Sequence, residues 1–152
     1  MKKIHLLFIG AIFLLNIFLR FQINSPITYL EATEGYNSYS LLLTGKDTNS
    51  QAWPLTFKGE ANYPSILAIY TRLPFVKLLG LDNLGVRLPA ILVGSLSSVL
   101  FLLWLYQTNI FASPKREMEF LLIGLLFAFS PWLISQNIFN LADTLALTLI
   151  LG

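Results

Sequence analysis

The longest uncharged stretch of the chain runs from Leu88 to Pro114 and reads LPAILVGSLSSVLFLLWLYQTNIFASP. A helix needs about 20 mostly apolar residues to cross the roughly 30 Å hydrocarbon core of a bilayer. The first part of this stretch meets that requirement, because its residues are aliphatic, aromatic or small and none would carry a charge into lipid. We therefore expect a membrane-spanning helix at about 88–107.

Two further uncharged stretches lie on either side of this one. They cover residues 4–19, with His5 neutral, and residues 120–142. They predict spans at about 4–21 and 118–136. A fourth apolar run starts near Leu141 and reaches Gly152, which is too short to cross the hydrocarbon core, so we expect 141–152 to be an incomplete span. The chain is then expected to be the N-terminal part, residues 1–152, of a larger transmembrane domain.

The composition agrees with a membrane protein. Hydrophobic residues make up 55% of the chain and charged residues 12%, with a mean hydropathy of +0.67. Soluble domains carry about a quarter charged residues, so a disordered chain, a coiled coil and an ordinary cytosolic enzyme are excluded. A net charge of +2 argues against a nucleic-acid partner, and the absence of cysteine excludes disulfides and thiolate metal sites. We predict an all-α integral membrane protein.

The basic residues predict the orientation in the membrane. Short loops rich in lysine and arginine stay in the cytoplasm. Lys2-Lys3 and Lys115-Arg116 are separated by two predicted spans, so both pairs are expected on the cytoplasmic side of the plasma membrane. Residues 22–87 then form a long extracytoplasmic loop, which translocates regardless of its own charges.

The extracytoplasmic loop is expected to be ordered. Thr28-x-x-Glu31 matches a capping box, and Gly45 supplies a helix stop, which together predict a helix over 29–44. Its apolar stripe of Ala32, Tyr36, Tyr39 and Leu43 is expected to be buried, against lipid or against the other helices.

A second interfacial helix is expected over 64–80. It would open at Pro64, bend at Pro74 and stop at Gly80. Residues 46–61 form an irregular polar connector between the two helices. Asp82 or Asn83 is expected to cap the span that follows.

A family resemblance extends over most of the chain. The motifs that carry it are, in order, Glu31, Gly35-Tyr36-Asn37, Thr44-Gly45-Lys46-Asp47, Pro74 to Leu81, Arg87-Leu88-Pro89, Ser130-Pro131-Trp132 and Asp143. In this order and spacing the chain resembles the N-terminal part of membrane glycosyltransferases of the GT-C superfamily, nearest to the protein O-mannosyltransferase and aminoarabinose-transferase group.

The resemblance implies transfer of a sugar from a polyprenyl-phosphate donor to an acceptor on the extracytoplasmic side. In such enzymes a loop carboxylate acts as general base on the acceptor, and basic side chains hold the donor phosphate. The resemblance implies Glu31 or Glu34 as the base and Arg87, with Arg72 as a weaker candidate, as the phosphate ligand. The sugar and the acceptor stay open, and a divalent metal is possible.

The chain departs from the family pattern at Leu30, where an aspartate is usual, and at Tyr63-Pro64-Ser65, where a basic residue or histidine followed by two prolines is usual. Either Glu31 or Glu34 takes the base role, or the chain is a diverged, non-catalytic membrane protein or assembly partner. A transporter fragment is the weakest alternative, since the polar residues gather in one outer loop.

Each candidate residue also has a plain structural interpretation. Glu31 completes a capping box, and Glu34 would lie on a solvated helix face, although two such carboxylates could share a proton or bind a metal. Asp143 is an acid at the membrane edge, which favours a functional role over helix capping. Arg87 could extend to the headgroups, and Arg72 could contact anionic lipid.

The orientation can be tested by chemical labelling, because the chain has no cysteine of its own. We expect Ser50→Cys to react with a membrane-impermeant thiol reagent in intact cells, since residue 50 would face the outside. Ser113→Cys should react only after the cells are opened. Labelling of Ser113→Cys but not of Ser50→Cys in intact cells would reverse the assignment.

Overall fold

The structure is a computed structural model that describes residues 3–22, 26–59, 63–108, 116–130, 134 and 141–152. The described residues form six helices and no strand, apart from one isolated β-bridge between Lys46 and Ala52. The helices are α1 (Lys3–Phe21), α2 (Tyr29–Thr44), α3 (Ile66–Leu79), α4 (Asn83–Thr108), α5 (Arg116–Ala128) and α7 (Leu141–Leu151). The predicted all-α class is confirmed for these residues.

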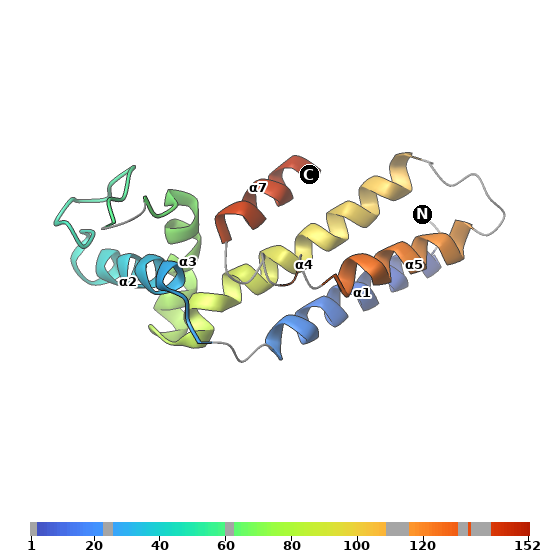
Figure 1. Cartoon of the computed structure of the whole chain (residues 1–152), viewed down its shortest axis with the longest axis horizontal. Helices are drawn as coiled ribbons and strands as arrows, with labels where there is room; N and C mark the ends of the chain where they lie inside the picture. Colours follow the sequence, from blue (N-terminus) through green and yellow to red (C-terminus); the bar gives the residue numbers. More distant parts are fainter. Residues whose placement is uncertain (1–2, 23–25, 60–62, 109–115, 131–133, 135–140) are drawn as a thin grey trace.

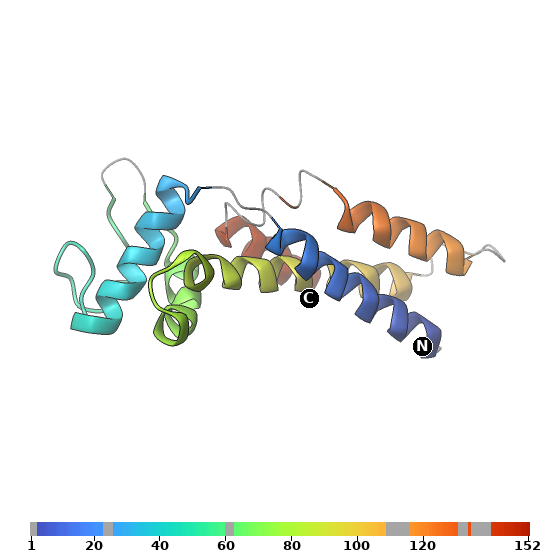
Figure 2. The same ribbon diagram turned by 90° about the horizontal axis from the view of Figure 1, so that it is seen from below.

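The molecule is elongated, with two unlike ends (Figures 1 and 2). Helices α2 and α3 and the segment between them form one end. Helices α1, α4 and α5 run lengthwise toward the other end, where the chain starts and where α4 finishes and α5 begins. Helix α4 belongs to both parts, because its start packs on α2 and α3 and the rest packs on α1, α5 and α7.

Of the spans expected from the sequence, the structure supports one. Helix α4 has 26 residues, which at 1.5 Å each gives about 39 Å. Among the described residues, only its segment Asn83–Gln107 is long and apolar enough to cross a membrane. Helix α1 has 19 residues, of which Leu6–Phe21 form a shorter apolar helix.

Helix α5 is shorter than the span expected at 118–136. It has 13 residues, or about 20 Å, and ends at Ala128. Residues 131–133 and 135–140 lie outside the described part of the chain. The expectation of three full spans is therefore not supported by the lengths of the described helices.

The lengthwise helices share an apolar core with the side chains of Ile9, Ile12, Leu102, Leu105, Phe120 and Ala128. Helices α1 and α5 approach closely at Gly124, where a Cβ atom would lie 2.5 Å from Ile12 Cδ1. One polar contact accompanies this packing, since the Ser98 hydroxyl donates to Asn16 Oδ1 at 3.2 Å. Both of these side chains are buried.

Helix α2 has the ends that the sequence predicts. The Thr28 hydroxyl accepts from the Glu31 backbone N–H at 3.3 Å, and the Glu31 carboxylate accepts from the Thr28 N–H at 2.8 Å. This reciprocal pair is a capping box. Gly45 closes the helix in the left-handed conformation, at φ 69°, where its N–H donates to the Leu41 carbonyl.

The buried face of α2 is the opposite of the one predicted. Tyr36 is 56% exposed and Leu43 66% exposed, Ala32 is also exposed, and Tyr39 is half-buried. The buried residues are Glu31, Glu34, Gly35, Asn37, Ser38 and Leu41. Burial of the apolar stripe against other helices is wrong for this structure, because the polar face finds partners on α3 and α4 that periodicity alone does not reveal.

Two small residues allow this polar face to pack closely. A Cβ atom at Gly35 would lie 2.8 Å from Val86 Cγ2, so only glycine lets α2 approach the start of α4 this closely. The Ser38 hydroxyl lies 2.8 Å from the carbonyl oxygens of both Glu34 and Ile69, which joins α2 to α3. Leu41 adds an apolar contact with Phe57 and Ile69.

Helices α3 and α4 begin at side-chain caps. Ser65, rather than Pro64, caps α3, which runs through Pro74 and ends before Gly80. The Asp82 carboxylate accepts from the Gly85 N–H at 2.7 Å at the start of α4, as one of the two predicted caps.

The connector between α2 and α3 is irregular, as expected, and its described residues, 46–59, are held by several hydrogen bonds. Asp47 Oδ1 accepts from the N–H groups of Asn49 and Gln51 at 2.9 and 2.7 Å. The ring of Tyr70 stacks on Trp53, and its hydroxyl donates to the Pro54 carbonyl at 3.1 Å.

The inverted face of α2 makes a prediction about stability. Ser38→Asp would place a carboxylate with no cationic partner in a fully buried site, and should lower the free energy of unfolding by about 3 kcal/mol or more. Tyr36→Asp lies on the exposed face and should cost less than about 1 kcal/mol. Thermal unfolding followed by circular dichroism measures both. Equal losses, or a larger loss for Tyr36→Asp, would mean that the tyrosine face is the packed one.

Candidate functional site

Two carboxylates lie one helical turn apart on the buried face of α2. Glu31 is 0% exposed and Glu34 is 2% exposed. Acidic side chains are seldom this buried unless they are paired. The partners of both are arginines from elsewhere in the chain, Arg87 in the first turns of α4 and Arg72 in α3.

The Glu31–Arg87 pair joins residues 56 positions apart in the sequence. Arg87 Nε donates to Glu31 Oε1 at 2.8 Å, and Arg87 Nη2 donates to Oε2 at 3.2 Å. This fork of two parallel hydrogen bonds is the strongest geometry for an arginine and a carboxylate. Nη2 also donates to the Pro26 carbonyl at 2.9 Å, which ties the entry to α2 to the start of α4.

The Glu34–Arg72 pair lies beside the first one. Arg72 Nη1 donates to Glu34 Oε2, and Arg72 Nε donates to the Val86 carbonyl at 3.1 Å. The other carboxylate oxygen, Oε1, accepts from the Ser65 N–H at 3.3 Å. Burial raises the pKa of Glu34, an effect that the charge and hydrogen bond of Arg72 reduce.

These pairs decide several of the alternatives raised by the sequence. Glu31 does complete a capping box, and it also holds Arg87. Glu34 is not on a solvated face, and the buried Arg72 is engaged by Glu34 and by the Val86 carbonyl. Each carboxylate faces its own arginine, so the two do not form a proton-sharing pair. No cluster of three or more metal-ligating side chains occurs among the described residues.

Asp143 lies in the first turn of α7, with an exposed side chain. An acid in this position interacts favourably with the helix dipole. Leu141, two residues earlier, packs on Ala68 of α3 and Ala90 of α4, so α7 begins beside the two helices that carry Arg72 and Arg87. A common cavity for Glu31, Arg87 and Asp143 stays a prediction.

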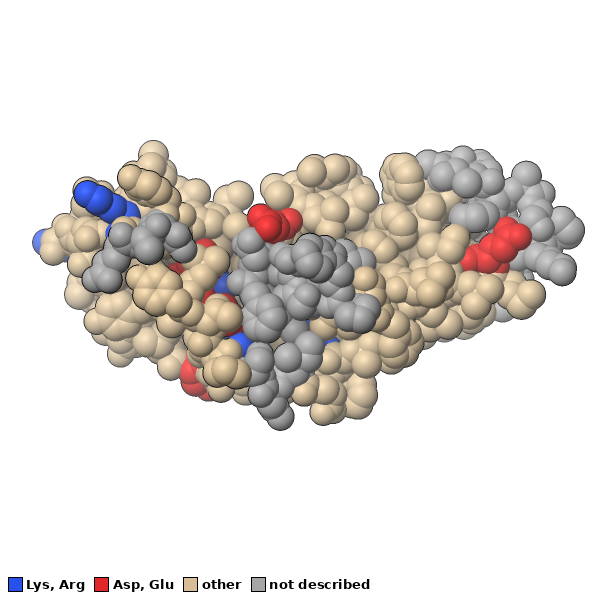
Figure 3. Space-filling view, viewed as in Figure 1, with Lys and Arg blue, Asp and Glu red and all other residues tan. Residues whose placement is uncertain are grey.

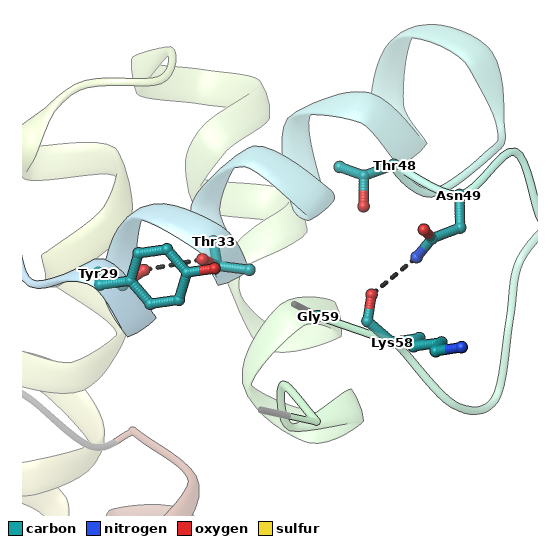
Figure 4. A pocket seen from close by; sticks show the side chains of 6 residues that line it. All are labelled: Tyr29, Thr33, Thr48, Asn49, Lys58 and Gly59. Carbon is teal, nitrogen blue, oxygen red and sulfur yellow. Dashed lines mark hydrogen bonds between the residues drawn. The ribbon is translucent and has the colours of Figure 1, made fainter. Parts of the chain in front are cut away.

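An open hollow lies on the other side of α2. It has a volume of about 560 Å³ and is lined by Tyr29 and Thr33 from α2 and by Thr48, Asn49, Lys58 and Gly59 from the connector (Figure 4). A neighbouring hollow of about 450 Å³ includes Tyr36 and Val86 in its lining. Exposed tyrosines, hydroxyls and a lysine can hydrogen-bond and stack with a polar ligand.

Charged residues are unevenly spread over the surface. On the face shown in Figure 3 they gather mainly around the α2–α3 end, and the lengthwise helices are largely uncharged outside the grey atoms. The buried ion pairs therefore lie at the end of the molecule where most of the charged residues of this face gather.

Sequence reasoning missed one buried polar group. Asn16 and Arg20 lie inside the first predicted span and are 0% and 1% exposed. Their spacing of four residues puts them on one helix face, and polar residues within a predicted span point to function. That signal was present in the sequence.

No family model, no curated protein and no solved structure matches this chain. The resemblance drawn from the sequence motifs accordingly stays a prediction.

The ion pairs predict non-additive effects of mutation. Glu34→Gln alone leaves Arg72 buried without its counter-charge and should cost about 3–5 kcal/mol of stability. The double variant Glu34→Gln/Arg72→Gln removes both charges and should recover at least about half of that loss. A double-mutant cycle measured by thermal unfolding tests this. Additive losses would show that the two side chains do not interact.

Proposed function

We propose that the chain is the N-terminal part of a GT-C-type membrane glycosyltransferase. It would transfer a sugar from a polyprenyl-phosphate donor to an acceptor on the extracytoplasmic side. The observation that carries this proposal is the Glu31–Arg87 pair, which places a carboxylate and a guanidinium side by side in the predicted outer loop. Glycosyl transfer needs a base at the acceptor oxygen and positive charge at the departing phosphate.

The arrangement of the helices supports the membrane part of the proposal. The start of α1, the end of α4 and the start of α5 lie at one end of the molecule, and α2 and α3 lie at the other (Figure 1). This is the alternation expected for spans at about 4–21, 88–107 and 118–136 with a cytoplasmic N-terminus. The largely uncharged surface of the lengthwise helices agrees with contact to lipid.

In the proposed mechanism the donor opens the Glu31–Arg87 pair. The donor phosphate takes the two N–H groups of Arg87 that now bind Glu31, which frees the carboxylate. Glu31 then accepts the proton of the acceptor hydroxyl while the acceptor oxygen attacks the anomeric carbon. The bond from that carbon to the phosphate oxygen breaks, and the polyprenyl phosphate leaves with the extra negative charge held by Arg87.

Glu34 and Arg72 would hold α2 against α3 during this opening. Glu34 also remains the second candidate base, because a raised pKa brings a carboxyl closer to the working pH of a general base. The hollow beside Tyr29 and Lys58 is the open surface on which an acceptor could be held.

A non-catalytic role is the second candidate, and two observations favour it. The carboxylates of Glu31 and Glu34 are buried and each is already paired with an arginine, as in a purely structural ion-pair network. Leu30 stands where the resemblance calls for the aspartate that acts as base. In this alternative the chain would be a diverged family member or an assembly partner.

Activity of paired variants separates the two candidates. Membranes containing the protein should release polyprenyl phosphate from a polyprenyl-phosphate sugar. Glu31→Gln should lower that rate by about 100-fold or more. The double variant Glu31→Gln/Arg87→Gln removes both charges of the pair and should keep the fold, yet it should stay inactive.

Glu119→Gln on α5 is the matched control and should retain the full rate. If the double variant folds and turns over donor at the normal rate, Glu31 and Arg87 are not catalytic. If the double variant Glu34→Gln/Arg72→Gln folds but is inactive, and Glu31→Gln is active, the base lies one helical turn further along α2.

A further inference from the structure

Arg20, in the last turn of α1, is buried with a charge that is only partly satisfied. Its side chain is 1% exposed. Arg20 Nη1 donates to Asn16 Oδ1, and to the Asn16 carbonyl at 3.3 Å. Asn16 in turn is held by Ser98 of α4 and by its own bond to the Ile12 carbonyl, so the guanidinium is fixed from one side.

The other edge of the guanidinium is unpartnered. Nε and Nη2 of Arg20 are buried and have no hydrogen-bond partner within the described part of the chain. These two N–H groups form the fork that takes two oxygens of a carboxylate or phosphate. Arg87 uses the same two atoms to bind Glu31. The Nε and Nη2 groups of Arg20 can therefore bind an oxyanion in the same way, but no described carboxylate pairs with them as Glu31 pairs with Arg87.

Helix α4 does not supply the missing acceptor at this level. The two helices run in opposite directions (Figure 2), and the contact between Asn16 and Ser98 sets their register. One turn further along α1 is Arg20, and one turn back along α4 is Gly94. Gly94 has no side chain, and its carbonyl already accepts from the Ser97 hydroxyl at 2.8 Å.

The described carboxylates of α2, of the connector and of the start of α4 are engaged elsewhere. Glu31 and Glu34 hold Arg87 and Arg72, and Asp82 caps α4. Asp47 closes a turn in the connector. A buried guanidinium without a counter-charge is strongly unfavourable, so an oxyanion from outside this set is expected.

We propose that the Nε and Nη2 edge of Arg20 binds the phosphate group of a membrane lipid. The inference rests on the membrane placement in the proposed function, but not on catalysis. Helix α1 starts at the predicted cytoplasmic end, so its last turn reaches the outer boundary of the hydrocarbon, where lipid phosphates lie. Arg72 and Arg87 would have to break an ion pair to bind a phosphate, whereas the Nε and Nη2 atoms of Arg20 have no ion pair to break.

Lipid retention by the purified full chain tests the proposal. The protein is kept in a phosphate-free maltoside detergent, and native mass spectrometry follows binding of four probes. They are polyprenyl phosphate, phosphatidylglycerol, diacylglycerol and inorganic phosphate. The wild-type chain should retain one or both phosphate lipids and should not retain diacylglycerol. Arg20→Gln should bind the phosphate lipids at least tenfold more weakly.

The controls separate phosphate binding from folding. Lys77→Gln removes an exposed cation from α3 and should bind as the wild type does. Arg20→Lys keeps a buried cation but lacks the fork, so it should fold, as judged by circular dichroism, and bind the phosphate lipids several-fold more weakly. If Arg20→Gln does not fold, the comparison of Arg20→Lys with the wild type still tests the proposal.

Preference for polyprenyl phosphate over phosphatidylglycerol would identify the lipid as an isoprenoid, and equal retention would indicate a general headgroup site. Equal retention by the wild type and by Arg20→Lys overturns the proposal, as does inorganic phosphate that binds as tightly as the lipids. No retention of any phosphate lipid also overturns it. If the protein retains a phosphate lipid through Arg20 but does not turn over the sugar donor, the lipid site is supported and only the proposed glycosyltransferase activity is contradicted.

Discussion

The burial of two carboxylates on one helix is the constraint on which this structure depends. Glu31 and Glu34 lie on the inner face of α2, where an unpaired charge would be strongly destabilising. Each must therefore meet a cation, and the chain brings Arg87 from α4 and Arg72 from α3 to do so. The positions of three helices are thereby linked, since moving any one of them would break an ion pair in a site of low dielectric constant.

Other features of this end of the molecule follow from that arrangement. The fork of Arg87 needs α2 close to the start of α4, and Gly35 makes this approach possible by leaving room for Val86. The Ser38 hydroxyl hydrogen-bonds the Ile69 carbonyl, so this buried polar group in the interface with α3 has a partner. The apolar stripe of α2 therefore points away from α3 and α4, and Tyr36 and Leu43 are exposed. In a membrane setting that stripe would face lipid or a further part of the protein, and in either case the polar face remains the packed one.

The three buried arginines differ in what remains of their hydrogen-bonding capacity. The fork of Arg87 is filled by Glu31, and Arg72 is divided between Glu34 and the Val86 carbonyl. Arg20 has one edge on Asn16 and one edge unpartnered among the described residues. Arg72 and Arg87 thus link helices through ion pairs, whereas Arg20 keeps the unpartnered edge that we propose binds a lipid phosphate.

The sequence by itself determined four helix ends, because the signals at those ends are local, whereas the end of α5 at Ala128 differs from the one predicted. The Thr28–Glu31 capping box, the left-handed Gly45, the stop at Gly80 and the cap at Asp82 each act within about four residues, and all four were predicted. The uncharged stretch after Arg87 likewise predicted α4. The face that α2 buries was decided only by the tertiary structure. Periodicity tells which residues share a face, but it cannot tell which face packs on protein when the partners lie 38 and 56 positions away. The candidate residues Glu31, Glu34, Arg72 and Arg87 were visible as charges in a membrane-like sequence, whereas their pairing depended on how three helices fold together, since an ion pair forms between neighbours in space.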